Sequence, residues 1–359
     1  MTIATDVSTV ELGSPRRDRL IAIAVKLSRW LGLLGLGWIG PLLRLALRDN
    51  PREQLAALRD GLLIPLAGIG LFVLAWASLA PQVHTSLGAI PGPQQVWEQA
   101  SSLWADHLAE RQKEADFYAR QAQRNLELTN IGQTDKVKTR PYSGRPTYVD
   151  QIFTSLRTVG LGFLLAAAIA VPLGIASGLS KVINSAINPL VQLFKPVSPL
   201  AWLPIVTMVV SAIYADASDA LPKSLVISAV TVTLCSLWPT LINTTLGVAS
   251  IDKDLINVGK VLQLSTATTV TKLVMPSALP YIFTGLRLSL GVGWMVLIAA
   301  EMLAQNPGLG KFVWDEFQNG SADSLARIMV AVLTIGLIGF LLDRIMLALQ
   351  SASTFTSSR

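Results

Sequence analysis

The residues of this chain that could do chemistry are few, and most of them lie inside long apolar runs. In the last three runs of the sequence they are Asn243, Arg287, Glu301 and Asp343. Because polar groups inside apolar helices are costly, they usually face a cavity, a partner or one another. These side chains could contact a polar solute or hold helices together, but they form no catalytic set.

Signals for catalysis or metal binding are missing from the sequence. The phosphate-binding loop of ATPases does not occur, since the nearest stretch, "GLGKF" at 308–312, lacks the first glycine and the hydroxyl. The only histidines, His84 and His107, are expected to be solvated surface groups. With Cys235 as the only cysteine, there is no disulfide within the chain and no metal-ligand cluster. We expect no enzyme activity, no cofactor and no metal in this chain.

The composition is that of a membrane protein. Of the 359 residues, 51% are hydrophobic and 14% are charged, whereas a soluble domain carries about 25% charged residues. A helix needs about 20 apolar residues to cross the hydrocarbon core. Six such spans are expected, at 62–80, 158–178, 199–214, 225–248, 281–303 and 325–349. The sequence therefore predicts an all-α membrane protein with about six transmembrane helices.

Lysine and arginine predict the orientation of these spans, because cytoplasmic loops are enriched in both. Nine of them precede the first span: Arg16, Arg17, Arg19, Lys26, Arg29, Arg44, Arg48, Arg52 and Arg59. The loops 181–195 and 251–276 also carry lysines, whereas 215–222 has acids and no bases. Both termini are thus expected in the cytoplasm. This bias explains the net charge of +6 without a nucleic-acid partner.

The segments outside the spans divide into two extensions and a tail. Residues 1–60 form an N-terminal extension, in which the apolar run 20–47 is interrupted by charges and by Gly40-Pro41. We expect that run to form a pair of helices lying on the membrane surface. Residues 61–350 form the transmembrane domain, and 351–359 form a tail.

The long external loop 81–150 is the second extension. Apolar residues recur at helical spacing over 94–128, and the remainder is rich in Gly, Pro, Thr and charge. A helix followed by an irregular connector is expected. The loop is either a spacer between spans or a docking surface for an extracytoplasmic partner.

The cytoplasmic segment 251–276 has the pattern of an amphipathic helix over 252–262. Its apolar face is expected to hold Leu255, Val258, Gly259 and Leu262. Such a short helix is marginal alone in water, so it should dock on a cytoplasmic partner or rest on lipid. Pro276 and Pro280 are expected to form a corner leading into the fifth span.

From about residue 62 to 349 the chain resembles the permease subunits of bacterial ATP-binding-cassette (ABC) importers. It is similar to the branch that carries nitrate, sulfonates, taurine and bicarbonate. The similar stretches are "IPGPQQVW" at 90–97, "VSPLAWLPI" at 197–205, "LWPTLINTTLGV" at 237–248 and "LPYIFTGLRLSLGVGWMVLIAAEML" at 279–303. The first sixty residues and part of the external loop look like additions to a shorter core.

Importer permeases of this kind share a cytoplasmic motif that begins Glu-Ala-Ala and has a glycine six positions after the Glu. Counting back from Pro276, these four positions fall on Asn257, Val258, Gly259 and Gln263. The acid and the motif's glycine are therefore absent. The nitrate-like version of the motif is close to "NVGKVLQLS", found here at 257–265.

The resemblance implies a type I importer permease fold in a bacterial inner membrane. It implies a homodimer, cytoplasmic ABC ATPases that bind Mg-ATP, and an extracytoplasmic substrate-binding protein. The residues it assigns to ATPase coupling are Asp254, Leu255, Asn257, Val258, Gly259, Leu262, Gln263 and Pro276. Nitrate is the expected substrate, and taurine, other sulfonates and bicarbonate are the alternatives.

Candidates for the translocation path are Trp202, Asn243, Arg287, Trp294 and Glu301. Arg287 could contact an anion or extend to the membrane interface, and Asn243 could line the path or pack between helices. Glu301 would repel an anion, so we expect it to serve as a structural hydrogen-bonding group. Trp202, Trp238 and Trp294 could form an aromatic gate, although packing is the simpler expectation.

Two other classes of protein compete with an importer permease. A secondary transporter driven by an ion gradient would show inverted repeats and more carboxylates within its spans. A membrane scaffold could use the same cytoplasmic helix to bind a partner without transporting anything.

Overall fold

The computed structural model describes residues 32, 37–46, 50–85, 88–214, 221–321 and 323–357. Its longer helices are α4 (Ile64–Leu79), α5 (Pro93–Asn130), α6 (Tyr148–Leu179), α7 (Lys181–Phe194), α8 (Pro199–Ile213), α9 (Lys223–Ala249), α12 (Met275–Ala304), α13 (Leu309–Asn319) and α14 (Ser324–Ser357). Shorter elements are α2 (Ile39–Ala46), α3 (Pro51–Leu58), α10 (Lys253–Val261), α11 (Thr266–Thr269) and the short helices η1 (Arg59–Leu63), η2 (Ala80–Gln82), η3 (Thr134–Lys136) and η4 (Val270–Val274). Within these ranges the only strands are β1 (His84–Thr85) and β2 (Gly88–Ala89), an antiparallel pair. The predicted all-α class is confirmed.

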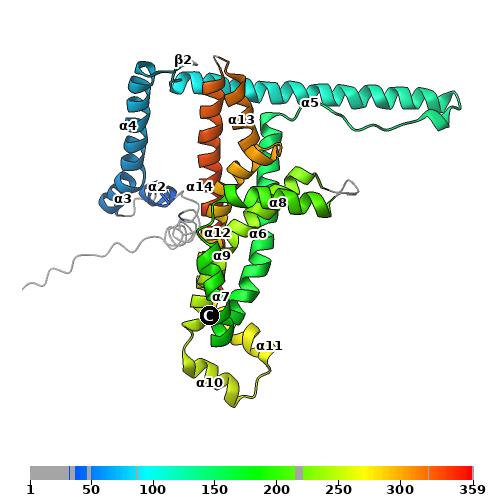
Figure 1. The fold of residues 1–359 in the computed structure, drawn as a ribbon. Coiled ribbons are helices and arrows are strands. Elements are labelled where there is room, and N and C mark those ends of the chain that lie inside the picture. The colour runs from blue at the N-terminus through cyan, green and yellow to red at the C-terminus, as the bar shows by residue number, and fades with distance from the viewer. Residues whose placement is uncertain are drawn as a thin grey trace, which may run out of the picture.

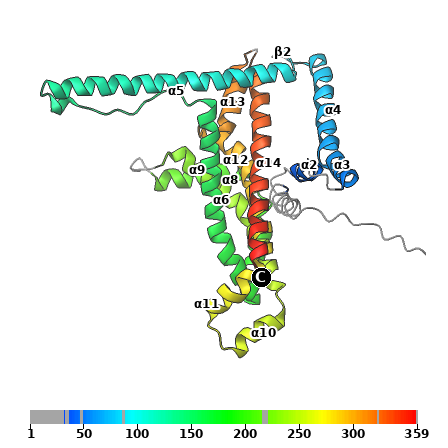
Figure 2. The same ribbon diagram turned by 180° about the vertical axis from the view of Figure 1, so that it is seen from behind.

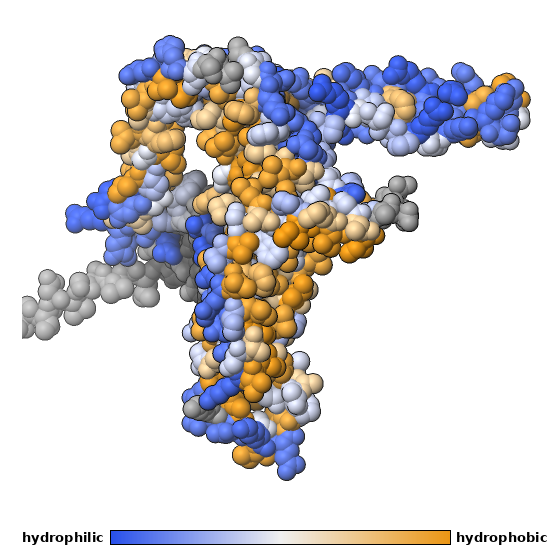
Figure 3. Space-filling view, viewed as in Figure 1, coloured by the Kyte–Doolittle hydropathy of each residue, from blue (hydrophilic) through white to orange (hydrophobic). Residues whose placement is uncertain are grey.

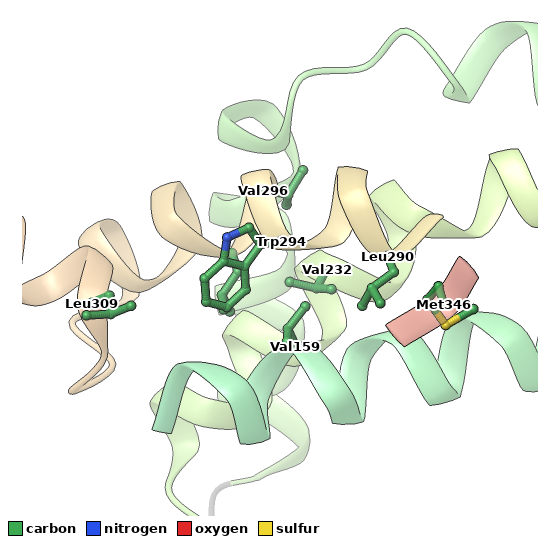
Figure 4. Close-up of a cluster of buried hydrophobic side chains, with 8 residues drawn as sticks. Val159, Val232, Leu290, Trp294, Val296, Leu309 and Met346 are labelled. Atoms are coloured by element: carbon green, nitrogen blue, oxygen red, sulfur yellow. The ribbon is translucent and has the colours of Figure 1, made fainter. Parts of the chain in front are cut away.

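Helices α6, α9 and α12 form the core of the bundle, and glycines set their spacing. A Cβ at Gly162 would lie 2.7 Å from Val232 Cγ1, and one at Gly174 would lie 2.6 Å from Thr244 Cβ. Such close approach favours helix association within a membrane. Figure 4 shows one cluster of this core, where Val159, Val232 and Leu290 meet beside Trp294.

The two ends of the bundle carry different elements. Helix α5 lies across one end, and α10 lies at the opposite end (Figures 1 and 2). Figure 3 shows hydrophobic surface along the bundle between them and a mainly hydrophilic α5. Helix α4 stands apart from the bundle, and none of its most apolar window is buried. The bundle therefore has the polarity expected of a membrane-embedded unit.

The number of predicted spans is close to that of the structure. In the described part of the chain five helices are long and apolar enough to cross a membrane, or six if α7 and α8 together make one span. The third predicted span, 199–214, is the helix α8, but the loop predicted at 181–195 is the helix α7, and the two helices meet at 105°. The chain leaves the helical conformation at Ser198, which is extended (ψ of 140°) because Pro199 follows it.

The prolines of the first and fifth spans do not break their helices, although the sequence analysis expected a corner at the start of the fifth. Helices run without interruption over Pro51–Gln82 and Thr266–Ala304, so the predicted corner at Pro276–Pro280 is wrong. A wide π-helical segment precedes Pro65 and another precedes Pro276. The wider turn relieves the clash between a proline ring and the carbonyl four residues earlier.

The predicted extensions are only partly described. Most of the N-terminal extension, including Arg16, Arg17, Arg19, Lys26 and Arg29, lies outside the described residues, as does most of the loop 215–222. Gly40-Pro41 does not interrupt a helix, because both residues lie in the first turn of α2. The predicted boundary at residue 60 falls inside the helix that begins at Pro51, and α14 continues to Ser357 into the predicted tail.

Candidate functional site

The predicted cytoplasmic helix is present as α10, and both of its ends are capped. Asp252 accepts a hydrogen bond from the Asp254 N–H (3.0 Å) at the start. At the other end Leu264 N–H donates to Gly259 O and Gln263 N–H donates to Lys260 O, both at 3.0 Å. These two bonds make a Schellman motif, which places one residue in the left-handed region. That residue is Gln263, with φ of 51°.

The outward face of α10 is a shallow hollow of about 260 Å³, lined by Asp254, Asn257, Val258, Val261 and Leu262. Its three apolar side chains are exposed, at 49% for Val258, 80% for Val261 and 63% for Leu262. The sequence analysis missed Val261, although the helical period places it beside Val258. An exposed apolar face on so short a helix is typical of a docking site for another chain.

The inward face of α10 packs against the start of the fifth-span helix, from Thr266 to Pro276, which we call the stem. Gly259 is buried, and a Cβ there would lie 2.9 Å from Leu273 Cδ1. Leu255 is half-buried, and Pro276 lies in the stem itself at the start of α12. Placing Gly259 on the partner-contacting face was therefore wrong. The glycine instead lets α10 approach the stem closely.

Arg287 on α12 and Asp343 on α14 form a two-point ion pair. Arg287 Nε lies 2.5 Å from Asp343 Oδ1, and Nη2 lies 2.9 Å from Oδ2. About a third of each side chain is exposed, at 36% and 35%. The sequence analysis named both residues but could not pair them, because 56 positions separate them.

The Arg287–Asp343 pair borders a hollow of about 610 Å³ between α12 and α14. The hollow is lined by Thr284, Arg287, Leu288, Gly291, Val292, Asp343 and Gln350. Gly291 keeps it open, since no atom lies within 4 Å of where its Cβ would be. A charged pair is too costly to leave against hydrocarbon, so this hollow faces water or another protein surface.

Glu301 is enclosed by protein and lines no opening, so its place among the path candidates was wrong. The side chain is 0% exposed and accepts hydrogen bonds from Ser155 Oγ and from Gly310 N–H (3.0 Å). Ser155 Oγ in turn accepts from Leu309 N–H at 2.9 Å. Glu301 therefore caps the start of α13 and has the structural role that the sequence analysis expected.

Asn243 and Trp294 pack between helices. Asn243 donates to Pro239 O (2.8 Å), and its Cβ lies against Gly285 on α12. Trp294 is 6% exposed and donates to Ile335 O at 3.0 Å. Trp294 also lines a hollow of about 220 Å³ with Arg287, Gly291 and Asp343.

Trp202, Trp238 and Trp294 do not lie together, and each packs against other side chains, the simpler of the two expectations. Trp202 and Trp238 both contact Phe194, with ring centroids 5.6 and 6.2 Å apart, at the elbow between α7 and α8. Trp294 lies in a different cluster. The sequence analysis missed Phe194, because nothing in the linear pattern brings the elbow onto α9.

Metal binding has no site in the described ranges, where no group of three His, Cys, Asp or Glu residues could hold an ion. The described residues thus form a short helix with an exposed apolar face, a hollow bordered by an ion pair, and a buried polar cluster around Glu301.

Residues 170–353 match the family model of the binding-protein-dependent transport system inner membrane component. The match spans α10, α12 and most of α14. The chain belongs to this family. As a family member it is a multi-pass component of an inner membrane, and the predicted resemblance to ABC importer permeases is confirmed.

Relatives of this inner membrane component fall in the predicted branch. The chain is 35% identical over 294 residues to the bicarbonate transport system permease protein CmpB of Synechococcus elongatus, covering 81% of this chain and 89% of that protein. It is 38% identical over 201 residues to the nitrate import permease protein NrtB of Synechocystis, covering 56% and 68%. A chain of the MetNI methionine ABC transporter in an inward-facing conformation aligns with a TM-score of 0.47 and 16% identity, covering 55% of this chain and 94% of that one.

Proposed function

We propose that this chain is the permease subunit of an ATP-driven importer for a small oxyanion, with nitrate as the substrate. Bicarbonate is the second candidate, because the match to the bicarbonate permease extends over 294 residues. Both anions are planar and present oxygen atoms that lie in one plane to a binding group. Taurine and other sulfonates are the remaining alternatives.

The end of the bundle that carries α10 is the cytoplasmic end in this proposal, and the end that carries α5 is extracytoplasmic. The lysines of the loops 181–195 and 251–276 support that orientation. Both chain termini then lie in the cytoplasm. Mg-ATP is bound by separate ABC ATPase subunits and not by this chain.

The observation that carries the proposal is the two-faced placement of α10. Its outward face (Asp254, Asn257, Val258, Val261 and Leu262) is exposed and partly apolar, whereas Gly259 presses on Leu273 of the stem. The stem continues without a break into α12, through Thr266–Ala304. An ATPase that binds the outward face can therefore move the fifth span as one rigid helix.

The hollow at Arg287 is the proposed contact for the anion. A guanidinium is a planar fork that matches two oxygen atoms of a planar oxyanion. The Nε and Nη2 atoms of Arg287 pair with the two carboxylate oxygens of Asp343 at the border of the hollow. A second copy of the chain would cover the hollow and close the path, because six spans are few for an aqueous channel.

The test is uptake by cells that express this chain with its ATPase and solute-binding protein. Labelled nitrate should enter in an ATP-dependent manner, and excess unlabelled taurine should leave that uptake unchanged. Uptake of bicarbonate instead would keep the permease assignment and change the substrate. Uptake that persists when ATP is depleted but an ion gradient is kept would contradict the proposal.

A further inference from the structure

Helix α5 forms most of a long arm at the end of the bundle opposite α10. We call its first part, up to Arg111, the root and the remainder the shaft. The 38 residues of α5 give it a length of about 57 Å. One part of α5 lies over the bundle, and the rest extends sideways beyond it (Figures 1 and 2). Among the described residues, the last ion pair from α5 to the bundle joins Arg111 to Asp150 on α6 at 3.0 Å.

The root of the arm is fixed to the bundle by both apolar and polar contacts. Val96 and Leu103 are buried in a cluster with Phe312 and Val330. Arg327 on α14 joins the elements by donating to Gln99 (3.2 Å) and to Glu316 (3.3 Å). The arm is therefore anchored to α13 and α14 and does not hang from a flexible linker.

The return segment 131–147 is held along the shaft by side-chain hydrogen bonds. Gln121 and Arg140 exchange two bonds, of 3.2 and 2.6 Å, and Asn125 donates to Lys138 O at 3.2 Å. The Tyr142 hydroxyl donates to Glu110 (2.7 Å), and this bond lowers the pKa of the Glu110 carboxyl. A simple spacer would not need these contacts, because ordering a chain segment costs conformational entropy. The shape of the arm is thus maintained away from the bundle.

The arm tip, which we define as residues 116–145, is basic. It carries three acids and six bases, the bases being Arg120, Arg124, Lys136, Lys138, Arg140 and Arg145. The part of α5 before it, 93–114, has four acids and two bases. Among the described residues none of the six bases of the tip forms an ion pair. The tip therefore presents unpaired positive charge to its surroundings.

We propose that the arm tip docks an acidic surface of the solute-binding protein on which this transport system depends. The proposal rests on the orientation given under the proposed function, which places the arm outside the cell. The family is that of binding-protein-dependent transport systems, and the proposed function places the binding protein on that side. Exposed charges of one sign steer a partner of the opposite sign and raise its association rate. Because the root is packed on α13 and α14, a binding protein held at the tip is connected to these two helices.

The experiment uses the full transporter in nanodiscs and the solute-binding protein co-expressed in the uptake assay above. One variant reverses two bases of the tip, Arg120→Glu with Arg124→Glu. The matched variant reverses two acids of the same tip, Asp116→Lys with Glu127→Lys. Association of the binding protein is followed by surface plasmon resonance at low and high salt. Basal ATP hydrolysis reports whether each complex is assembled.

The base-reversed variant should associate about tenfold more slowly than wild type, and the acid-reversed variant should associate faster. Both differences should shrink as salt rises, because exposed charges are screened. Equal slowing in both variants would mean that only the shape of the arm matters, and would overturn the proposal. Wild-type rates in both variants would overturn it as well.

Two further outcomes separate this proposal from the proposed function. If the wild-type complex neither binds the binding protein nor hydrolyses ATP faster in its presence, the proposed function fails and this proposal fails with it. If the wild type responds but base reversal weakens only binding to vesicles of phosphatidylglycerol, the tip binds lipid and this proposal alone is overturned.

Discussion

Ser155 on α6 and Glu301 on α12 are hydrogen-bonded across 146 positions of sequence, with Ser155 Oγ 2.9 and 2.8 Å from the two carboxylate oxygens. Both residues are 0% exposed. The same hydroxyl accepts from Leu309 N–H, and the carboxylate accepts from Gly310 N–H. This pair therefore fastens α6, α12 and the start of α13 at one end of the bundle.

Ser155→Ala should lower the free energy of unfolding by about 2 kcal/mol, because Glu301 and the Leu309 N–H each lose a buried partner. Thermal unfolding of the purified chain in detergent would show the loss. Ser101→Ala is the matched control, since Ser101 is exposed on α5 and bonds only to Trp97 O. An equal unfolding temperature for Ser155→Ala and Ser101→Ala would show that the buried pair contributes nothing.

Arg287→Gln and Asp343→Asn should differ in their effect on uptake. Loss of the guanidinium should raise the apparent KM for the anion by roughly 10- to 100-fold, the range for a lost charged hydrogen bond. Asp343→Asn leaves the guanidinium in place, so it should change KM much less. Initial rates of uptake at several anion concentrations would separate the two. Equal losses in both variants, with assembled complex, would mean that the pair is only structural.

Gln263→Gly should stabilise the end of α10 by roughly 1 kcal/mol, because Gln263 holds a left-handed backbone that costs an ordinary residue about that much. Hydrogen exchange at the Leu264 amide, which bonds to Gly259 O, would report the gain. Gln263→Ala keeps a Cβ and should show none. Faster exchange in the glycine variant would contradict the assigned cap.

The loss of transport should increase with the size of the side chain that replaces Gly259. Gly259→Ala needs only a small shift of Leu273, since the nearest atom is the end of a flexible side chain at 2.9 Å. Gly259→Phe would push α10 off the stem and should abolish uptake while the protein stays in the membrane. Uptake and the amount in the membrane fraction would be measured together. Wild-type uptake by Gly259→Phe would refute the bracing role.

The sequence predicted what depends on local pattern. Long apolar runs gave the membrane class and most of the spans, since length and hydropathy alone decide whether a helix can cross. The amphipathic period and charged first turn predicted α10 within a residue or two. The motif position that falls on Gln263 is also explained, because the backbone there suits glycine.

Other features depend on contacts that no local pattern reports. The pairing of Arg287 with Asp343 and the enclosure of Glu301 by Ser155 join residues far apart in sequence. Gly259 was assigned to the wrong face because its neighbour Leu273 comes from a helix expected to begin later. The bend between α7 and α8 was missed because residues 181–195, which form α7, were assigned to a loop.

The central claim is that the outward face of α10 couples this permease to ATP hydrolysis, and proteoliposomes containing the assembled transporter test it most directly. Val258→Asp places a carboxylate on the outward face, where docking would bury it at high cost. Lys260→Asp places the same group at an exposed position on the other side of α10. We predict that Val258→Asp abolishes ATP-dependent nitrate uptake and the ATPase response to loaded binding protein, whereas Lys260→Asp retains both. Full uptake by Val258→Asp would contradict the coupling role of α10.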